Sequence, residues 1–175
     1  MRLAATISLT VVISGIAACS TDVATHVPAT STLSSASAPN RSWGPETPPF
    51  NLEVVLRGTE GFGLVKFRQP NDGASIIDLD TWVRGLAPNT SYVLQRAAET
   101  NLDGVCTSTA WLTLGKGLVP QALTTDATGS AREALWRSVA SLPVGSSYDI
   151  QFRVVNVATS DVVLTSDCYR YTISL

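Results

Sequence analysis

Carboxylates are the only ionisable side chains that this sequence offers in sufficient number for a catalytic or metal site. The chain has 175 residues, with 14 Asp+Glu, 12 Lys+Arg and one histidine, His26. Ser-His-Asp, Cys-His and multi-histidine metal sites all need an imidazole, and His26 lies in a linker-like segment. The formal net charge of −2 gives no excess of positive charge for a nucleic-acid backbone. We therefore expect no catalytic residue, no cofactor and no nucleic-acid partner.

Four aspartates stand where a carboxylate could bind a cation or the backbone of a turn. Asp78 and Asp80 stand two residues apart, so they would leave the same face of a strand and could bind a cation. No stretch has the alternating ligands and terminal Glu of an EF-hand loop. We interpret the pair as a solvated acidic strip and predict no metal site, with a structural cation as the alternative. Asp103 and Asp126 lie in turns, where we expect each carboxylate to accept hydrogen bonds from its own turn backbone.

Trp82 and Trp111 are the side chains best suited to a ligand surface. If Leu79 and Val83 face the core, strict alternation along a strand places Trp82 on the outer face, and Leu112 places Trp111 outward in the same way. Flat indole rings edged by hydroxyl and carboxylate groups suit the apolar face of a sugar ring. These residues predict a glycan platform, with the alternative that a β-bulge shifts the register and buries both rings.

The first 18 residues have the parts of a secretory signal. Arg2 supplies a positive charge, and the uncharged apolar stretch from Leu3 to Ala18 is shorter than the roughly 20 residues of a membrane-spanning helix. Ile16-Ala17-Ala18-Cys19 resembles the lipobox of bacterial lipoproteins, in which diacylglycerol is attached to the cysteine before cleavage. The resemblance implies that lipid on Cys19 anchors the protein to a bacterial membrane outside the cytoplasm. Cleavage without lipid would instead give a secreted protein.

Cys106 and Cys168 remain as a pair if Cys19 carries lipid. An odd number of cysteines in an exported protein needs an explanation, and this chain has three. An oxidising compartment permits a disulfide. The two cysteines are 62 positions apart, and closing a loop of that length would stabilise the fold by about 4 kcal/mol in the chain-entropy model. We predict a Cys106–Cys168 disulfide, with two buried free thiols as the alternative.

The chain is expected to divide into the signal (residues 1–18), a tether (19–49) and a folded domain (50–175). Ser, Thr, Ala and Pro dominate the tether, which contains His26 and Trp43 and has no apolar period. Such a composition cannot bury enough apolar surface to offset the entropy of ordering the chain. We expect the tether to stay extended and to hold the domain away from the membrane.

Short β-rich runs separated by turn clusters follow Phe50 and predict an all-β, antiparallel sandwich or barrel of about seven to nine strands. The apolar residues of 131–140 also have the spacing of one face of an amphipathic helix. Of the two alternatives, strand and helix, we favour the strand. The strands are expected at 52–57, 62–67, 75–84, 91–98, 107–114, 131–138, 148–155, 161–165 and 168–174.

The stretch Gly85-Leu86-Ala87-Pro88-Asn89-Thr90-Ser91-Tyr92 resembles the corner of fibronectin type III and related immunoglobulin-like sandwiches. In those domains the proline turns the chain between sheets, and the tyrosine hydroxyl bonds back to the corner backbone. The resemblance implies an immunoglobulin-like Greek-key sandwich with Pro88 and Tyr92 at a corner. It implies nothing about a ligand.

A lipid-anchored, non-enzymatic binding or structural module of the cell envelope is the function that these features favour. Its membrane partner would be reached through the lipid on Cys19. One alternative is a carbohydrate or cell-wall glycan-binding module that uses Trp82 and Trp111. Another is a protein-binding or inhibitory domain that acts through loops such as Leu118–Asp126.

Overall fold

The computed structural model describes residues 50–70 and 73–174 of the chain. The expected signal, Cys19 and the tether lie outside the described residues. Strands and turns make up the secondary structure of the described part, so the all-β prediction is confirmed. Within these two ranges no helix is long and apolar enough to cross a membrane.

Twelve strands in the described residues form one continuous sheet. Residues 131–138 form a strand, as favoured, whereas the predicted strand at 107–114 is wrong over most of its length and leaves only β5. The strands are β1 (Phe50–Arg57), β2 (Phe62–Gln69), β3 (Ile76–Arg84), β4 (Ser91–Glu99), β5 (Leu112–Thr113), β6 (Gly115–Lys116), β7 (Val119–Pro120), β8 (Ala122–Thr124), β9 (Ala131–Ser138), β10 (Ser147–Asn156), β11 (Val162–Ser166) and β12 (Tyr169–Thr172).

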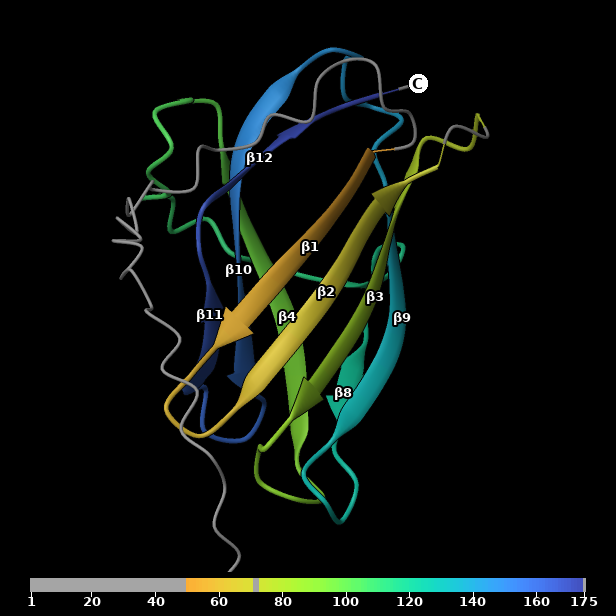
Figure 1. Ribbon diagram of the computed structural model, residues 1–175. Helices are drawn as coiled ribbons and strands as arrows, with labels where there is room; N and C mark the ends of the chain where they lie inside the picture. The colour runs from red at the N-terminus through yellow and green to blue at the C-terminus, as the bar shows by residue number, and fades with distance from the viewer. Residues whose placement is uncertain (1–49, 71–72, 175) are drawn as a thin grey trace, which may run out of the picture. The chain divides into compact units, whose positions relative to one another are not determined.

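The sheet of this domain is curled into a nearly closed, barrel-like form (Figure 1). Its order is β5-β4-β10-β11-β1-β2-β3-β9-β6-β7, while β12 also pairs with β10 and β8 with β4. All pairs are antiparallel except β6–β9. No ladder joins β4 directly to β9 in the described residues. Residues 112–116 cross the gap between them, because β5 pairs with β4 and β6 pairs with β9.

The core lies inside the curled sheet and is supplied by alternate residues of the long strands. In β10, Ile150, Phe152 and Val154 point inward and are buried. The Phe67 ring from β2 packs edge-on against Phe152 at 6.1 Å and against Tyr171 at 4.8 Å between centroids. Burial of each such aromatic side chain contributes about 1.5–3 kcal/mol to folding.

The segment between β4 and β5 covers the outer face of β4 and β10. A strand over 107–114 would need backbone hydrogen bonds to a neighbouring strand, but backbone N–H groups of this segment donate to carboxylates instead. Thr107 donates its backbone N–H to Glu99 Oε1 at 2.6 Å, and Gly104 donates to Asp149 Oδ2 at 2.7 Å. The predicted disulfide between Cys106 and Cys168 is confirmed and ties the segment to the residue before β12. These local contacts explain why the segment has no ladder partner.

The corner at Pro88 is held by a buried threonine. Thr125 donates its hydroxyl to the Ala87 carbonyl at 2.7 Å, and the same oxygen accepts the Thr90 N–H at 3.0 Å. Tyr92, at the start of β4, is 2% exposed and packs in the core. In residues 50–70 and 73–174 no hydrogen bond joins its hydroxyl to the corner backbone. The tyrosine therefore anchors the corner by packing, and Thr125 supplies the bonds.

Candidate functional site

The two tryptophans lie on the outer surface of the sheet and are partly buried. Trp82 leaves β3 beside Phe62, with ring centroids 6.3 Å apart, and the Arg84 guanidinium stands 5.2 Å from its ring centroid. Trp111 precedes β5 and is covered on one side by the Arg153 guanidinium at 4.0 Å. Each indole therefore has a cation over part of its surface, where a cation–π contact stabilises it.

Trp82 and Trp111 do not share one surface. Trp82 belongs to β3, and Trp111 packs on Arg153 of β10, with β11, β1 and β2 between those two strands in the sheet order. Four strand spacings correspond to about 19 Å along the sheet. Alternation along each strand determines which face a side chain takes, but not which strands become neighbours. Each tryptophan would therefore have to bind a ligand separately.

A shallow groove of about 520 Å³ runs beside Trp82 on the outer face of β2, β3 and β9. Arg132 binds both oxygens of Asp80, at 2.9 and 2.6 Å, and this hydrogen bonding lowers the pKa of that carboxyl. Asp80 is thus half of an ion pair across β3 and β9, and not a free member of an acidic strip with Asp78. In the part of the chain that the structure describes, no three His, Cys, Asp or Glu residues are grouped to hold a metal ion.

Asp126, which also lines this groove, is a turn residue as predicted. Its Oδ1 accepts the backbone N–H of Thr128 at 2.8 Å and that of Ser130 at 3.1 Å. Asp103 acts in the same way toward Val105 N–H at 2.9 Å. Hydrogen bonds to the Thr128 hydroxyl and to the turn backbone lower the pKa of Asp126. Both carboxylates are accounted for by their own turns.

An exposed apolar cluster occupies the hairpin between β6 and β7, at the start of the predicted Leu118–Asp126 loop. Leu118 is 82% exposed, Val119 is 68% exposed, and the neighbouring Trp136 of β9 is 40% exposed. Gly117 has φ 69° and lies against the Trp136 ring, so a side chain there would be strained and would strike the indole. The rest of the predicted loop contains β7 and β8.

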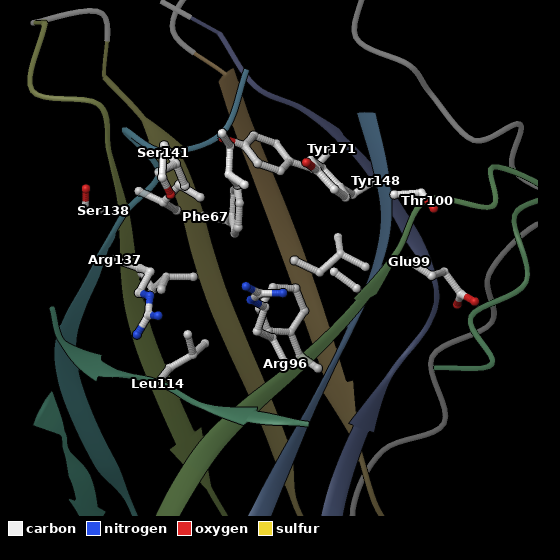
Figure 2. A pocket seen from close by; sticks show the side chains of 17 residues that line it. Phe67, Arg96, Glu99, Thr100, Leu114, Arg137, Ser138, Ser141, Tyr148 and Tyr171 are labelled. Carbon is white, nitrogen blue, oxygen red and sulfur yellow. The ribbon is translucent and has the colours of Figure 1, made fainter. Parts of the chain in front are cut away.

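The cavity inside the sheet is the best-formed candidate site. It has a volume of about 540 Å³ and lies beside the gap between β4 and β9. Its walls are core side chains, among them Phe67, Leu79, Ile150 and Phe152, and Leu114 from the crossing segment lies at its base. Figure 2 shows Tyr148 and Tyr171 at the opposite end of this space. The cavity lies where the end of β4, beyond its pairing with β8 and β5, faces β9 without a ladder.

Two arginines enter this cavity from its two bordering strands. Figure 2 shows the guanidinium group of Arg96, from β4, in the middle of this space, and that of Arg137, from β9, at its side near Leu114. Arg96 is partly buried and has no hydrogen bond or ion pair to any described residue. Arg137 Nη1 donates only to the Gly117 carbonyl, at 3.3 Å. Burial lowers the pKa of Arg96, and the positive charge of Arg137 lowers it further.

Glu99, which lines the cavity, and Glu133, on the same face of β9 as Arg137, are engaged elsewhere. Glu99 accepts hydrogen bonds from Thr107, and Figure 2 shows its carboxylate turned away from the cavity. Glu133, on the inner face of β9, forms an ion pair with Lys116 at 2.8 Å. The cavity therefore carries two positive charges without a carboxylate partner among the described residues.

The end of the cavity near Tyr171 is closed by a buried polar cluster. The Tyr171 hydroxyl donates to Gln69 Oε1, and the same oxygen accepts the Ser174 N–H at 3.0 Å. Gln69 Nε2 donates in turn to the Ser174 carbonyl at 2.6 Å. Burial raises the pKa of Tyr171, so its hydroxyl stays protonated. This cluster ties β2 to the chain after β12 and fixes the shape of that end.

Arg96 and Arg137 were not among the predicted site residues. The signal for them was an arginine at an inward position of a strand, since Arg137 shares a parity with Leu135 and Val139, and Arg96 with Leu94. Charged residues on an inward face indicate either a poor core or a cavity, and the tertiary structure shows the cavity.

Comparison of the chain with protein-family models and with curated proteins finds no match.

Proposed function

We propose that this protein is a non-enzymatic binding module of the cell envelope that holds a small apolar ligand in the cavity between β4 and β9. The cavity itself carries this proposal. Its volume of about 540 Å³ lies within the usual range for ligand pockets, and its walls are mainly apolar with few polar groups. Ligand pockets of this type lie in the mouths of barrel-like sheets.

Filling the cavity should weaken binding of an apolar ligand. Ala98 lines the cavity on β4, and Ala98→Phe would place a ring in it, whereas Ala134→Phe adds the same ring to an exposed position of β9. We expect the full chain carrying Cys19→Ala, used to avoid attached lipid and detergent, to bind the neutral probe N-phenyl-1-naphthylamine saturably. Fluorescence titration should show affinity reduced at least about tenfold by Ala98→Phe, because the ring occupies the probe's volume.

Ala134→Phe is the matched control and should bind as the parent does. Thermal unfolding of each variant checks that the fold is retained. Absence of saturable binding by the parent, or equal binding by Ala98→Phe, would contradict the proposed function.

We propose that Cys19 carries the lipid anchor. The Cys106–Cys168 disulfide supports this, because it leaves Cys19 as the one cysteine of three outside the bridge. In the producing bacterium, Cys19→Ala should move the protein from the membrane fraction to the soluble fraction and abolish labelling by radioactive palmitate. Immunoblots of both fractions measure the first effect. A membrane-bound and acylated Cys19→Ala protein would show that the anchor lies elsewhere.

The finer fold that we propose is the immunoglobulin-like Greek key. Two features support it: β3 and β4 follow one another but pair with β9 and β10 instead, and β1 pairs with β11. Crossed connections of this kind are typical of Greek-key sheets. The buried position of Tyr92 after the Pro88 corner agrees with the same resemblance.

The groove beside Trp82 supports a second candidate function, the binding of an envelope glycan. It combines an indole with the charged groups of Lys66, Asp80 and Arg132, which suit the faces and hydroxyls of a sugar. Trp82→Ala should abolish retention on cell-wall polysaccharide in a pull-down. Trp111→Ala, on another surface, is the matched control and should leave retention unchanged. Equal retention by both variants would remove this candidate.

A further inference from the structure

The charge in the cavity, together with its apolar walls, suggests which ligand it takes. We propose that the ligand is an amphipathic anion, with a single acidic group held between Arg96 and Arg137 and a hydrocarbon chain among the core side chains. This inference rests on the proposed function of the cavity and adds the chemical class of the ligand.

The first step concerns the two guanidinium groups. Partial burial of a cation is unfavourable unless an anion or several hydrogen bonds compensate it. Arg96 has no hydrogen bond or ion pair to a described residue, and Arg137 has one carbonyl contact at 3.3 Å. Two like charges that face one space also repel each other. An anion between them would satisfy both, and each planar guanidinium can donate two parallel hydrogen bonds to a carboxylate or phosphate.

The second step concerns the protein's own carboxylates, which do not compensate the charges of Arg96 and Arg137. Glu99 is bonded to Thr107 on the outer side of β4, and Glu133 is paired with Lys116. The hydroxyl of Tyr171 is committed to Gln69. Both carboxylates therefore have other partners. The negative charge has to come with the ligand.

The third step concerns the remainder of the ligand. The space beyond the arginines is bounded by Phe67, Ile77, Leu79, Ile150 and Phe152. A small inorganic anion would leave these side chains facing an empty apolar space, whereas a hydrocarbon chain would fill it. Each methylene taken from water into such a space strengthens binding by about fourfold. A chain with one acidic end therefore fits both parts of the cavity.

The test uses the full chain carrying Cys19→Ala and four twelve-carbon probes that differ only in their heads: dodecanoate, dodecyl phosphate, dodecanol and dodecyltrimethylammonium. Displacement of N-phenyl-1-naphthylamine measures their affinities. We expect at least one of the two anions to bind about tenfold or more tightly than dodecanol, and the cation to bind most weakly. The tighter of the two anions identifies the acidic group as carboxylate or phosphate.

Variants of the two arginines test whether Arg96 and Arg137 cause the preference for an anionic head. Arg96→Gln and Arg137→Gln should each weaken binding of the preferred anion about tenfold and leave dodecanol unchanged, which also shows that the cavity is intact. Arg96→Lys should restore part of the loss, because it keeps the charge without the planar pair of donors. Arg68→Gln, on the exposed face of β2, is the matched control and should change nothing.

The outcomes separate this inference from the proposed function. If dodecanol binds as tightly as both anions, or the arginine variants lose no affinity for them, the inference is wrong and the cavity is a site for neutral ligands. If N-phenyl-1-naphthylamine itself does not bind, the proposed function fails and the inference fails with it. If the dye binds but none of the four probes displaces it, the inference alone is wrong.

Discussion

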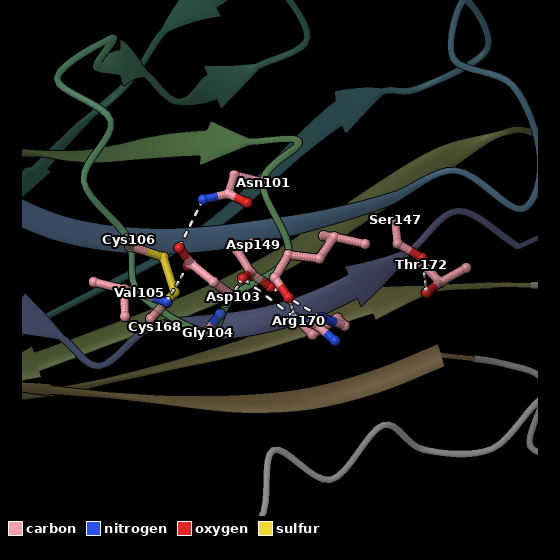
Figure 3. Close-up of polar contacts among 11 residues, drawn as sticks. Asn101, Asp103, Gly104, Val105, Cys106, Ser147, Asp149, Cys168, Arg170 and Thr172 are labelled. Carbon is pink, nitrogen blue, oxygen red and sulfur yellow. Dashed lines mark hydrogen bonds and ion pairs between the residues drawn. A yellow bond between two sulfur atoms is a disulfide. The ribbon is translucent and has the colours of Figure 1, made fainter.

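Replacing Arg170 with methionine is expected to lower the free energy of unfolding markedly, because it leaves the buried Asp149 carboxylate without its counterion. The Asp149 side chain is fully buried, and Arg170 binds it through Nε at 3.0 Å and through Nη2 at 3.3 Å (Figure 3). Gly104 N–H, at 2.7 Å, would remain as the partner. The same guanidinium also donates to the Leu102 carbonyl at 2.6 Å, so the covering segment would lose a second contact.

Urea denaturation followed by fluorescence measures this effect. Arg57→Met is the matched control, because Arg57 pairs with Asp167 at 3.4 Å with both side chains mostly exposed, and such a pair contributes less than about 1 kcal/mol. Arg170→Met combined with Asp149→Asn should recover much of the lost stability, since the amide needs no counterion. A loss in Arg170→Met no larger than in Arg57→Met would show that Asp149 does not depend on this pair.

Removing the disulfide by Cys106→Ala and Cys168→Ala is expected to cost about 4 kcal/mol, from the entropy that a loop of this length regains in the unfolded chain. The bridge joins residues separated by 62 positions and ties the covering segment to the residue before β12. Urea denaturation gives the change in stability. Amide hydrogen exchange at Gly104 and Thr107 should accelerate more than in β1 and β2, because the segment loses its tie to β12.

The disulfide and the Arg170–Asp149 pair hold the same segment, so their losses should not add. Once Cys106 is free, Gly104 is less firmly placed to donate to Asp149, and the Arg170→Met change should cost less in that background. Thiol titration of the unfolded protein confirms that the parent contains the bridge. Equal stability of the parent and the double alanine variant would show that the segment is held by its hydrogen bonds alone.

Alternation along the chain predicts most of the strands and the direction of their side chains. It predicts the strand at 148–155, now β10, and puts Trp82 on the outer side of β3, because both properties depend on neighbours two residues apart. The same alternation fails at residues 107–111. There the Thr107 N–H donates to the Glu99 carboxylate, and the disulfide fixes the adjacent Cys106 against Cys168, so the segment forms no ladder.

The sequence by itself predicted the all-β class and a Cys106–Cys168 disulfide, with free thiols as the alternative, whereas the inward positions of Arg96 and Arg137 became evident only in the structure. Only the tertiary structure decided that the two arginines share one cavity and that the two tryptophans do not share one surface. The reason is that strand order is set by non-local pairing: β4 and β9 lie near opposite ends of the sheet order and approach each other because the sheet curls. Periodicity within a strand depends on neighbours in sequence and does not predict which distant strands approach each other.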